Sequence, residues 1–303
     1  MAVPETVTAT RQALGQVGVW LGALAREQAQ TQRSAVRRIE ELGYGSIFEG
    51  EGVGGNDVFA QEAAWLCATS RIVTGAGIAN IWARHPGTAQ AAAAALGDAW
   101  PGRFVLGLGV SHAPLIDRTG LTYERPLERM RDYLDGMDRA SVSPPPRPVP
   151  RMLAALRRRM LELARDRADG AHTYFVPPEH TAQAREVLGP DRLLIPEQAI
   201  CLETDPVTAR GIARQHTGFY LGLPNYVNNL KRFGLTDEDL AGAGSDRLVD
   251  TIVAWGDEAT VAARIRAHHA AGADHVLIQP LAGDVQGALR QLEQLTAAVL
   301  VPG

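Results

Sequence analysis

The chain of 303 residues is 46% hydrophobic and carries a net charge of −4 at pH 7, which allows one α/β barrel or two smaller domains. This charge excludes a broad nucleic-acid-binding surface, because the densest basic run is only Arg157–Arg159. The apolar run Val17–Ala25 is too short to span a membrane. Cys67 and Cys201 stand in apolar contexts typical of buried, reduced thiols, so we expect a cytoplasmic protein with no membrane or nucleic-acid partner.

The first half of the chain alternates between short apolar runs and amphipathic segments. Strands of a buried parallel sheet are continuous apolar runs, whereas helices repeat apolar residues every three to four positions. The segment Gln28–Leu42 has the helical spacing and ends before Gly43, a residue typical of a helix C-terminus. We expect strands over 17–21, 46–48, 71–79 and 103–109, and helices over 28–42, from about 57 to 69, and over 87–100.

The second half continues this alternation with one interruption. After a charged amphipathic helix over 123–140, the proline-rich stretch Ser143–Pro150 predicts an extended connector within the domain. From His216 to Asp246 the sequence is rich in aromatic and amide residues, which favours an insertion over a site, at about 216–247, rather than a second domain. We expect strands over 152–155, 169–176, 193–202 and 275–279, and helices over 157–167, 178–188, 258–271 and 284–300.

Eight strand–helix units predict a single (β/α)8 TIM barrel with the insertion before its last strand. A doubly wound sheet is the alternative, but the run Gly107-x-Gly109-x-x-His112 lacks the third glycine of a dinucleotide fingerprint. In a barrel, functional side chains gather where the strands end. That rule selects Glu49, Glu51, residues 80–85, Ser111, His112, residues 154–159, His172, Tyr174, Glu203 and Gln279.

Four sequence runs carry a family resemblance: GIANIWARHP over 77–86, RFVLGLGVSHAPLI over 103–116, LAAL over 153–156 and RDRADGAHTYF over 165–175. Together they resemble the bacterial-luciferase-like superfamily, and within it an actinobacterial branch of oxidoreductases associated with the deazaflavin coenzyme F420. The resemblance covers nearly the whole chain. It implies a barrel whose cavity holds a flavin-like tricyclic ring, with FMN as the alternative cofactor.

The resemblance also implies which residues hold the cofactor. The third strand's end, around Ala79–Asn80, is expected to contain a non-proline cis peptide beside the ring, and the loop after the fifth strand is expected to hold the phosphate. Small or flat side chains at these strand ends suit a flat apolar slot. The candidate cofactor-binding residues are Ala79, Asn80, Ile81, Trp82, Gly109, Val110, Ser111, Ala154, Ala155, Leu156, Arg157 and Arg158.

Three side chains are candidates for proton chemistry. Many relatives place a histidine where this chain has Gly52, so we assign that role to His112, the strand-end residue best able to titrate near neutrality. Glu51 is the second candidate, with a solvated loop carboxylate as the alternative interpretation. His85 is the third, although a residue before Pro86 can simply mark the entry to a helix.

The phosphate loop also departs from the family pattern. In close relatives this loop looks like Ala-Ala-Leu-Gly-Pro, whereas this chain has Arg157 at the glycine position. The Arg157 guanidinium is therefore expected either to bind the phosphate or to block the site. The leading hypothesis is an F420-dependent oxidoreductase that transfers a hydride to or from a small organic substrate. An FMN-dependent monooxygenase and a degenerate, non-catalytic cofactor-binding homologue stay open. No metal site is expected, and a second copy of the chain is an optional partner.

Overall fold

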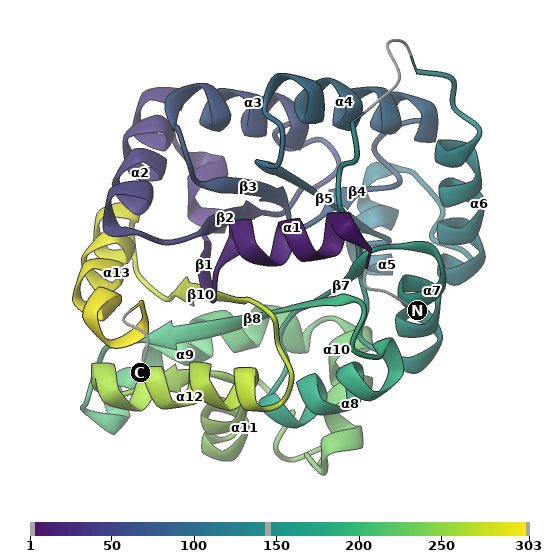
Figure 1. Cartoon of the computed structure of the whole chain (residues 1–303). Coiled ribbons are helices and arrows are strands. Elements are labelled where there is room, and N and C mark those ends of the chain that lie inside the picture. The colour runs from purple at the N-terminus through teal and green to yellow at the C-terminus, as the bar shows by residue number, and fades with distance from the viewer. Residues whose placement is uncertain (1–3, 143–146, 301–303) are drawn as a thin grey trace.

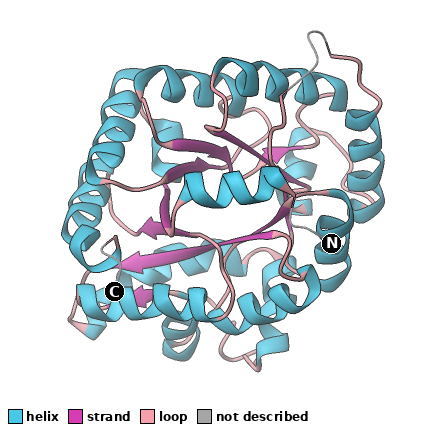
Figure 2. Cartoon of the chain, in the orientation of Figure 1, coloured by secondary structure: helices cyan, strands magenta, loops and turns pink. Residues whose placement is uncertain are grey.

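Eight parallel strands form a closed barrel in the computed structural model, which describes residues 4–142 and 147–300. Strand β10 pairs with both β1 and β8, which closes the ring of eight barrel strands. This confirms the predicted (β/α)8 architecture (Figure 2). The barrel strands are β1 (Val17–Trp20), β2 (Ser46–Glu49), β3 (Val73–Ala76), β5 (Phe104–Gly109), β6 (Arg151–Ala154), β7 (Gly170–Thr173), β8 (Leu193–Cys201) and β10 (Val276–Pro280).

Helices surround the barrel (Figure 1). Their buried apolar residues pack in the same clusters as those of the strands. Local signals start and stop them: Asp57 accepts a hydrogen bond from the Ala60 amide at the start of α3, and Gly43 adopts a left-handed conformation, with φ 94°, after α2. The outer helices are α2 (Ala29–Leu42), α3 (Val58–Ala68), α4 (Pro86–Ala99), α6 (Pro126–Asp138), α7 (Arg158–Arg167), α8 (Pro178–Leu188), α12 (Glu258–Ala270) and α13 (Val285–Val299).

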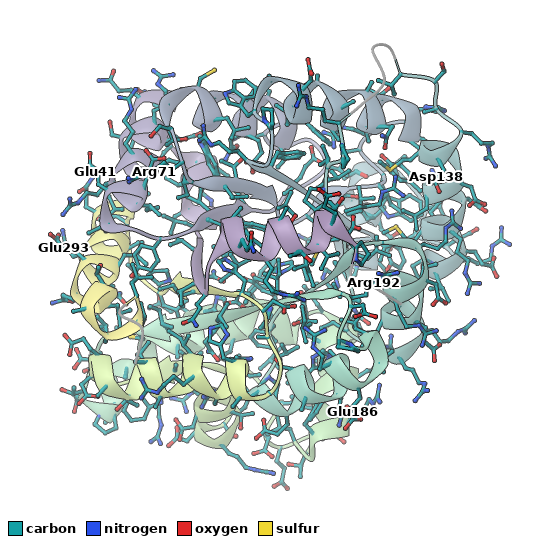
Figure 3. All side chains as sticks on the ribbon, in the orientation of Figure 1. Glu41, Arg71, Asp138, Glu186, Arg192 and Glu293 are labelled. Atoms are coloured by element: carbon teal, nitrogen blue, oxygen red, sulfur yellow. The ribbon has the colours of Figure 1, made fainter. Side chains whose placement is uncertain are left out.

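Charged side chains lie on the outer face of this helical ring. Glu41 and Glu293 point away from the barrel (Figure 3), and Arg38 lies within 2.6 Å of Glu293. Both side chains of that pair are more than 40% exposed, so water screens their attraction. In the described residues no helix combines the length and apolar character needed to cross a bilayer.

A helix that was not predicted, α1 (Glu5–Leu14), crosses the end of the barrel where the strands begin (Figure 1). Its Val7 and Leu14 are fully buried against side chains of the barrel interior, among them Phe48 and Val105. Because α1 and these side chains fill the amino end, an open cavity can form only toward the carboxyl ends of the strands.

The predicted third strand is divided in two. Residues 71–79 form β3 and then, after a cis peptide bond between Gly77 and Ile78, the short β4 (Ala79–Asn80). The resemblance had placed the cis bond two residues later. Both pieces pair with β5, but Gly75 lies opposite Val105 and Ala79 opposite Leu108, so the third strand carries one extra residue.

That extra residue explains the glycine at the end of β5. A Cβ atom on Gly109 would lie 2.4 Å from the Ile78 side chain, and one on Gly107 would lie 2.0 Å from the Ala76 carbonyl oxygen. Both positions therefore require glycine, because the neighbouring third strand passes too close for a side chain.

Several predicted boundaries shift. The helix expected from Tyr123 begins at Pro126, since Arg125 adopts a left-handed φ of 41° before the proline. The first four residues of the predicted connector, 143–146, lie outside the described residues. Cys67 is exposed, contrary to expectation, whereas Cys201 is buried; both thiols are free.

The segment predicted as an insertion is largely helical. Its expected start, His216, lies inside α9 (Pro206–Leu221), which Asp205 caps. Helices α10 (Pro224–Leu230) and α11 (Asp246–Ile252) follow, and β9 (Ala254–Trp255) pairs with the end of β8. The end of α9 and the start of α10 reach the carboxyl side of the barrel, where the cavity lies.

Candidate active site

A cavity of about 230 Å³ opens at the carboxyl ends of the barrel strands. Its walls are mostly apolar and aromatic, which is typical of a site for a flat organic ligand. As predicted, the segment after residue 216 supplies part of the lining, including Tyr220 and Tyr226. The full lining is Trp20, Gly50, Glu51, Gly77, Ile78, Val110, Ser111, His112, Leu115, Ala154, Ala155, Leu156, His172, Tyr174, Phe219, Tyr220, Leu223, Asn225 and Tyr226.

Of the fifteen candidate catalytic and cofactor-binding residues, the structure brings seven to this cavity. Those that line it are Glu51, Val110, Ser111, His112, Ala154, Ala155 and Leu156. Arg157 and Arg158 lie in an adjoining groove. The residues absent from the lining are Ala79, Asn80, Ile81, Trp82, His85 and Gly109.

The cavity wall at the third strand is built by Gly77 and Ile78, not by the predicted residues 79–82. Ala79 pairs with Leu108 where β4 meets β5, and Ile81 is buried in the core between the sheet and its helices. Trp82 donates its indole hydrogen to the Val110 carbonyl oxygen at 2.8 Å. The extra residue in the third strand changes which side chains point into the barrel. A prediction that assumes a regular strand therefore selects residues 79–82 instead of Gly77 and Ile78.

His85 has a structural role. It is the exposed N-cap of α4, and its Nδ1 accepts a hydrogen bond from the Gly87 amide at 3.1 Å. Of the two interpretations of His85, the structure supports the second, a residue at the start of a helix.

Glu51 is not a solvated loop carboxylate. Its side chain is 2% exposed, and its carboxylate accepts two hydrogen bonds from the Arg84 guanidinium, one of 2.6 Å from Nη1 to Oε2 and one from Nη2 to Oε1. The amides of Asn80 and Val58 also donate to it, at 2.8 and 3.3 Å. With both oxygens occupied, Glu51 ties the loop after β2 to the bulged third strand, the two segments that form one wall.

His112 lines the same cavity just after the end of β5. Its ring lies 4.9 Å from the ring of Tyr226, and its Nδ1 is buried without a partner among the described residues. Burial lowers the pKa of His112 to about 4. The imidazole is therefore neutral at pH 7, which corrects the expectation that it titrates near neutrality.

A second polar wall lies across β7, α9 and β10. The Tyr174 hydroxyl is 2.6 Å from Oε1 of Gln279 and 2.7 Å from the Tyr220 hydroxyl. His172 lines the cavity beside Tyr174, and the residue is 3% exposed. The strand-end rule selected His172 and Tyr174, but Trp20 and the tyrosines of α9 and α10 had no comparable sequence signal.

A groove that we call the arginine groove continues outward from the cavity, with which it shares Val110, Ala154, Leu156 and Asn225. Arg157, the N-cap of α7, donates to the Asn225 amide oxygen at 2.8 Å, and Arg158 pairs with Glu162. In residues 4–142 and 147–300, no carboxylate lies within ion-pairing distance of the side chains of Arg157, Arg159 and Arg232, which share the groove. The groove therefore carries uncompensated positive charge.

Part of the chain is similar in sequence to known proteins. Over 121 residues the chain is 31% identical to a Mycobacterium tuberculosis protein that is named as a coenzyme F420-dependent oxidoreductase, a match covering 40% of this chain and 35% of that one. The chain thus spans about a third of that relative's length.

Solved structures share the fold at low sequence identity. The F420-dependent tetrahydromethanopterin reductase of Methanopyrus kandleri superposes with a TM-score of 0.78 at 17% identity, covering 94% of this chain and 98% of that one. The oxygenating constituent of 3,6-diketocamphane monooxygenase from Pseudomonas putida, in complex with FMN, gives a TM-score of 0.67 at 15% identity over 95% and 99% of the two chains. The family model of luciferase-like monooxygenases matches residues 12–188, more than half of the chain. The chain therefore belongs to the luciferase-like monooxygenase family.

Proposed function

We propose that this protein is an oxidoreductase that binds coenzyme F420 and transfers a hydride to or from a small organic substrate. The observation that carries the proposal is the continuity between a flat-walled apolar cavity and the arginine groove. A deazaflavin has a matching build, since an aromatic tricycle leads into a chain that bears a phosphodiester and several carboxylates.

The residues present fit such a group. Ile78, Val110 and Ala155 supply small or apolar surface for a ring, and His112 Nδ1 and His172 Nε2 are buried polar atoms that lack a protein partner among the described residues. In the groove, Arg157 is held by an amide rather than a carboxylate, so its charge stays available to an anion. The N-terminus of α7 adds its own partial positive charge there.

The extent of the positive charge favours F420 over FMN. FMN brings one phosphate, whereas the groove offers Arg159 and Arg232 in addition to Arg157. Each charge-assisted hydrogen bond to an anion contributes about 1.5–3 kcal/mol. The names of the Mycobacterium tuberculosis and Methanopyrus kandleri relatives support the same cofactor.

When bound, the deazaflavin supplies two-electron hydride chemistry. The chain's own contribution is positioning and proton handling: the apolar walls exclude water, the Glu51–Arg84 pair holds one wall in place, and neutral His112 exchanges a proton with the substrate at the mouth. Since His112 is neutral at pH 7, its imidazole has one nitrogen that donates a hydrogen and one that accepts.

An FMN-dependent monooxygenase is the second candidate, favoured by the likeness to the FMN complex from Pseudomonas putida. A degenerate homologue is the third, in which Arg157 obstructs the cofactor site. These three alternatives make different predictions for ligand binding.

Fluorescence titration of the purified protein with F420 and with FMN separates them. We expect F420 to bind more tightly, and Arg157→Ala to weaken F420 binding roughly tenfold to a hundredfold, with a smaller loss at high salt. Arg38→Ala, on α2 and outside the groove, is the matched control and should bind like the wild type. Tenfold tighter binding of FMN would favour the monooxygenase, and tighter binding after Arg157→Gly, or no binding of either cofactor, would favour the degenerate homologue.

A further inference from the structure

The two ring nitrogens of His172, a buried residue in the cavity lining, differ in their hydrogen bonding. His172, in β7, places Nδ1 2.8 Å from the carbonyl oxygen of Ile195, its register partner on β8. A carbonyl oxygen can only accept, so Nδ1 must carry the hydrogen. The other nitrogen, Nε2, is buried and has no hydrogen-bond partner among the described residues.

The ring holds only this one proton at neutral pH. Burial lowers the pKa of His172 to about 4, against a smaller opposing effect of the bond to Ile195. Glu197, on the next strand, does not offset this, since burial raises its own pKa to about 8. With the proton held on Nδ1, Nε2 exposes a lone pair and is an acceptor.

The hydroxyls of Tyr174 and Tyr220 do not supply a hydrogen to it. Tyr174 donates its only hydroxyl hydrogen to Oε1 of Gln279, which leaves the Tyr220 hydroxyl as the donor in the pair it forms with Tyr174. Trp20 likewise donates its indole hydrogen to the Gly77 carbonyl oxygen. These three donors of the surrounding wall are therefore all engaged.

A buried acceptor left unpaired costs free energy comparable to a lost hydrogen bond. We infer that His172 is a specificity-determining residue of the cavity: its Nε2 accepts a hydrogen bond from an N–H group of the bound ring system, so ligands that bring a donor to this point are selected. The inference rests on the proposed function only for the identity of that ring system. Deazaflavins and flavins share the relevant chemistry, an imide N–H on the pyrimidine ring.

Nitrogen-15 NMR of histidine-labelled protein tests the acceptor without any ligand. The expected spectrum of the free protein shows His172 with a protonated Nδ1 and an unprotonated Nε2. His275 is an internal control in the same sample, because its Nδ1 faces the Gly15 carbonyl oxygen and its Nε2 is already paired with Ser46 at 2.7 Å. A proton on Nε2 of His172 would overturn the inference.

Binding then tests the donor. On saturation with F420, or with FMN, Nε2 of His172 should shift toward the hydrogen-bonded position while His275 stays unchanged. FMN methylated at its imide nitrogen should bind roughly tenfold to a hundredfold more weakly than FMN to the wild type. FMN and the methylated FMN should bind equally to His172→Phe, which has no acceptor. His172→Gln restores an acceptor, so it should again bind FMN more tightly than the methylated FMN, by a smaller factor than the wild type.

The outcomes separate this inference from the proposed function. If both cofactors bind but Nε2 does not shift and methylation has no effect, the inference is wrong and the proposed function stands. If neither cofactor binds, the proposed function fails, and the protonation pattern of the free protein alone decides whether His172 is an acceptor.

Discussion

The Glu51–Arg84 ion pair is the best place to test how the cavity wall is held. The carboxylate is 2% exposed and the guanidinium 12% exposed, and together they connect the loop after β2 to the bulged third strand. Glu51→Gln keeps the size and one acceptor oxygen but removes the negative charge. Arg84 would then remain buried with only Asp57, at 2.9 Å, as a counter-ion.

The magnitude follows from this geometry. Removing one partner of a buried pair typically lowers the free energy of unfolding by about 3–5 kcal/mol, since the remaining charge is uncompensated. Asp57, although 56% exposed, still compensates part of the Arg84 charge, so we expect the lower limit, about 3 kcal/mol. For 303 residues the unfolding entropy is about 0.6 kcal/mol per degree, which converts this loss into a fall in Tm of roughly 5 °C.

Differential scanning calorimetry measures the effect, with Glu293→Gln as the matched control. Glu293 pairs with Arg38 across two exposed side chains, so its loss should change the free energy of unfolding by at most about 1 kcal/mol. The double variant Glu51→Gln with Arg84→Met should be more stable than Glu51→Gln alone, because it removes the stranded charge. Equal shifts for Glu51→Gln and Glu293→Gln would refute the idea that this pair holds the wall.

Three further predictions concern stability and turnover. Burial raises the pKa of Glu49 from 4.5 to about 8, so the contribution of its protonated form to folding stability is complete below pH 4.5 and is lost as the pH rises through about 8. The Tm of Glu49→Gln minus that of the wild type should therefore grow from pH 5 to pH 8. A constant difference would contradict this. Gly109→Ala should lower the free energy of unfolding by about 1–3 kcal/mol through the contact with Ile78, whereas Gly211→Ala, in a helix with open space around it, should raise it by about 0.5–1 kcal/mol in urea titrations. His112→Ala should lower turnover roughly 10²-fold while leaving cofactor affinity nearly unchanged, and undiminished turnover would show that His112 is structural.

The barrel itself could be predicted from the sequence because its signals are local. Each apolar run of strand length and each amphipathic helix is readable within about 15 residues, and parallel strands separated by helices allow few arrangements. The strand-end rule therefore placed His112, Glu51 and Ala154–Leu156 at the cavity without any knowledge of their contacts.

Contacts between distant segments decided the rest. The bulge at Gly77–Ile78 is defined by pairing with β5, so no local pattern shows that Ile78 rather than Asn80 faces the cavity. Likewise, Glu51 reads as a loop carboxylate until the fold brings Arg84 to it from 33 positions along the chain.

The chemistry of the histidines depends on burial in the same way. His112 and His172 each have an ordinary pKa near 6.5 in an extended chain, and desolvation in the folded barrel lowers the pKa of both to about 4. Which nitrogen of His172 carries its proton is set by the Ile195 carbonyl on the neighbouring strand. A residue's type and its place at a strand end are properties of the sequence, but its protonation state and its free hydrogen-bonding atoms arise only when the strands assemble.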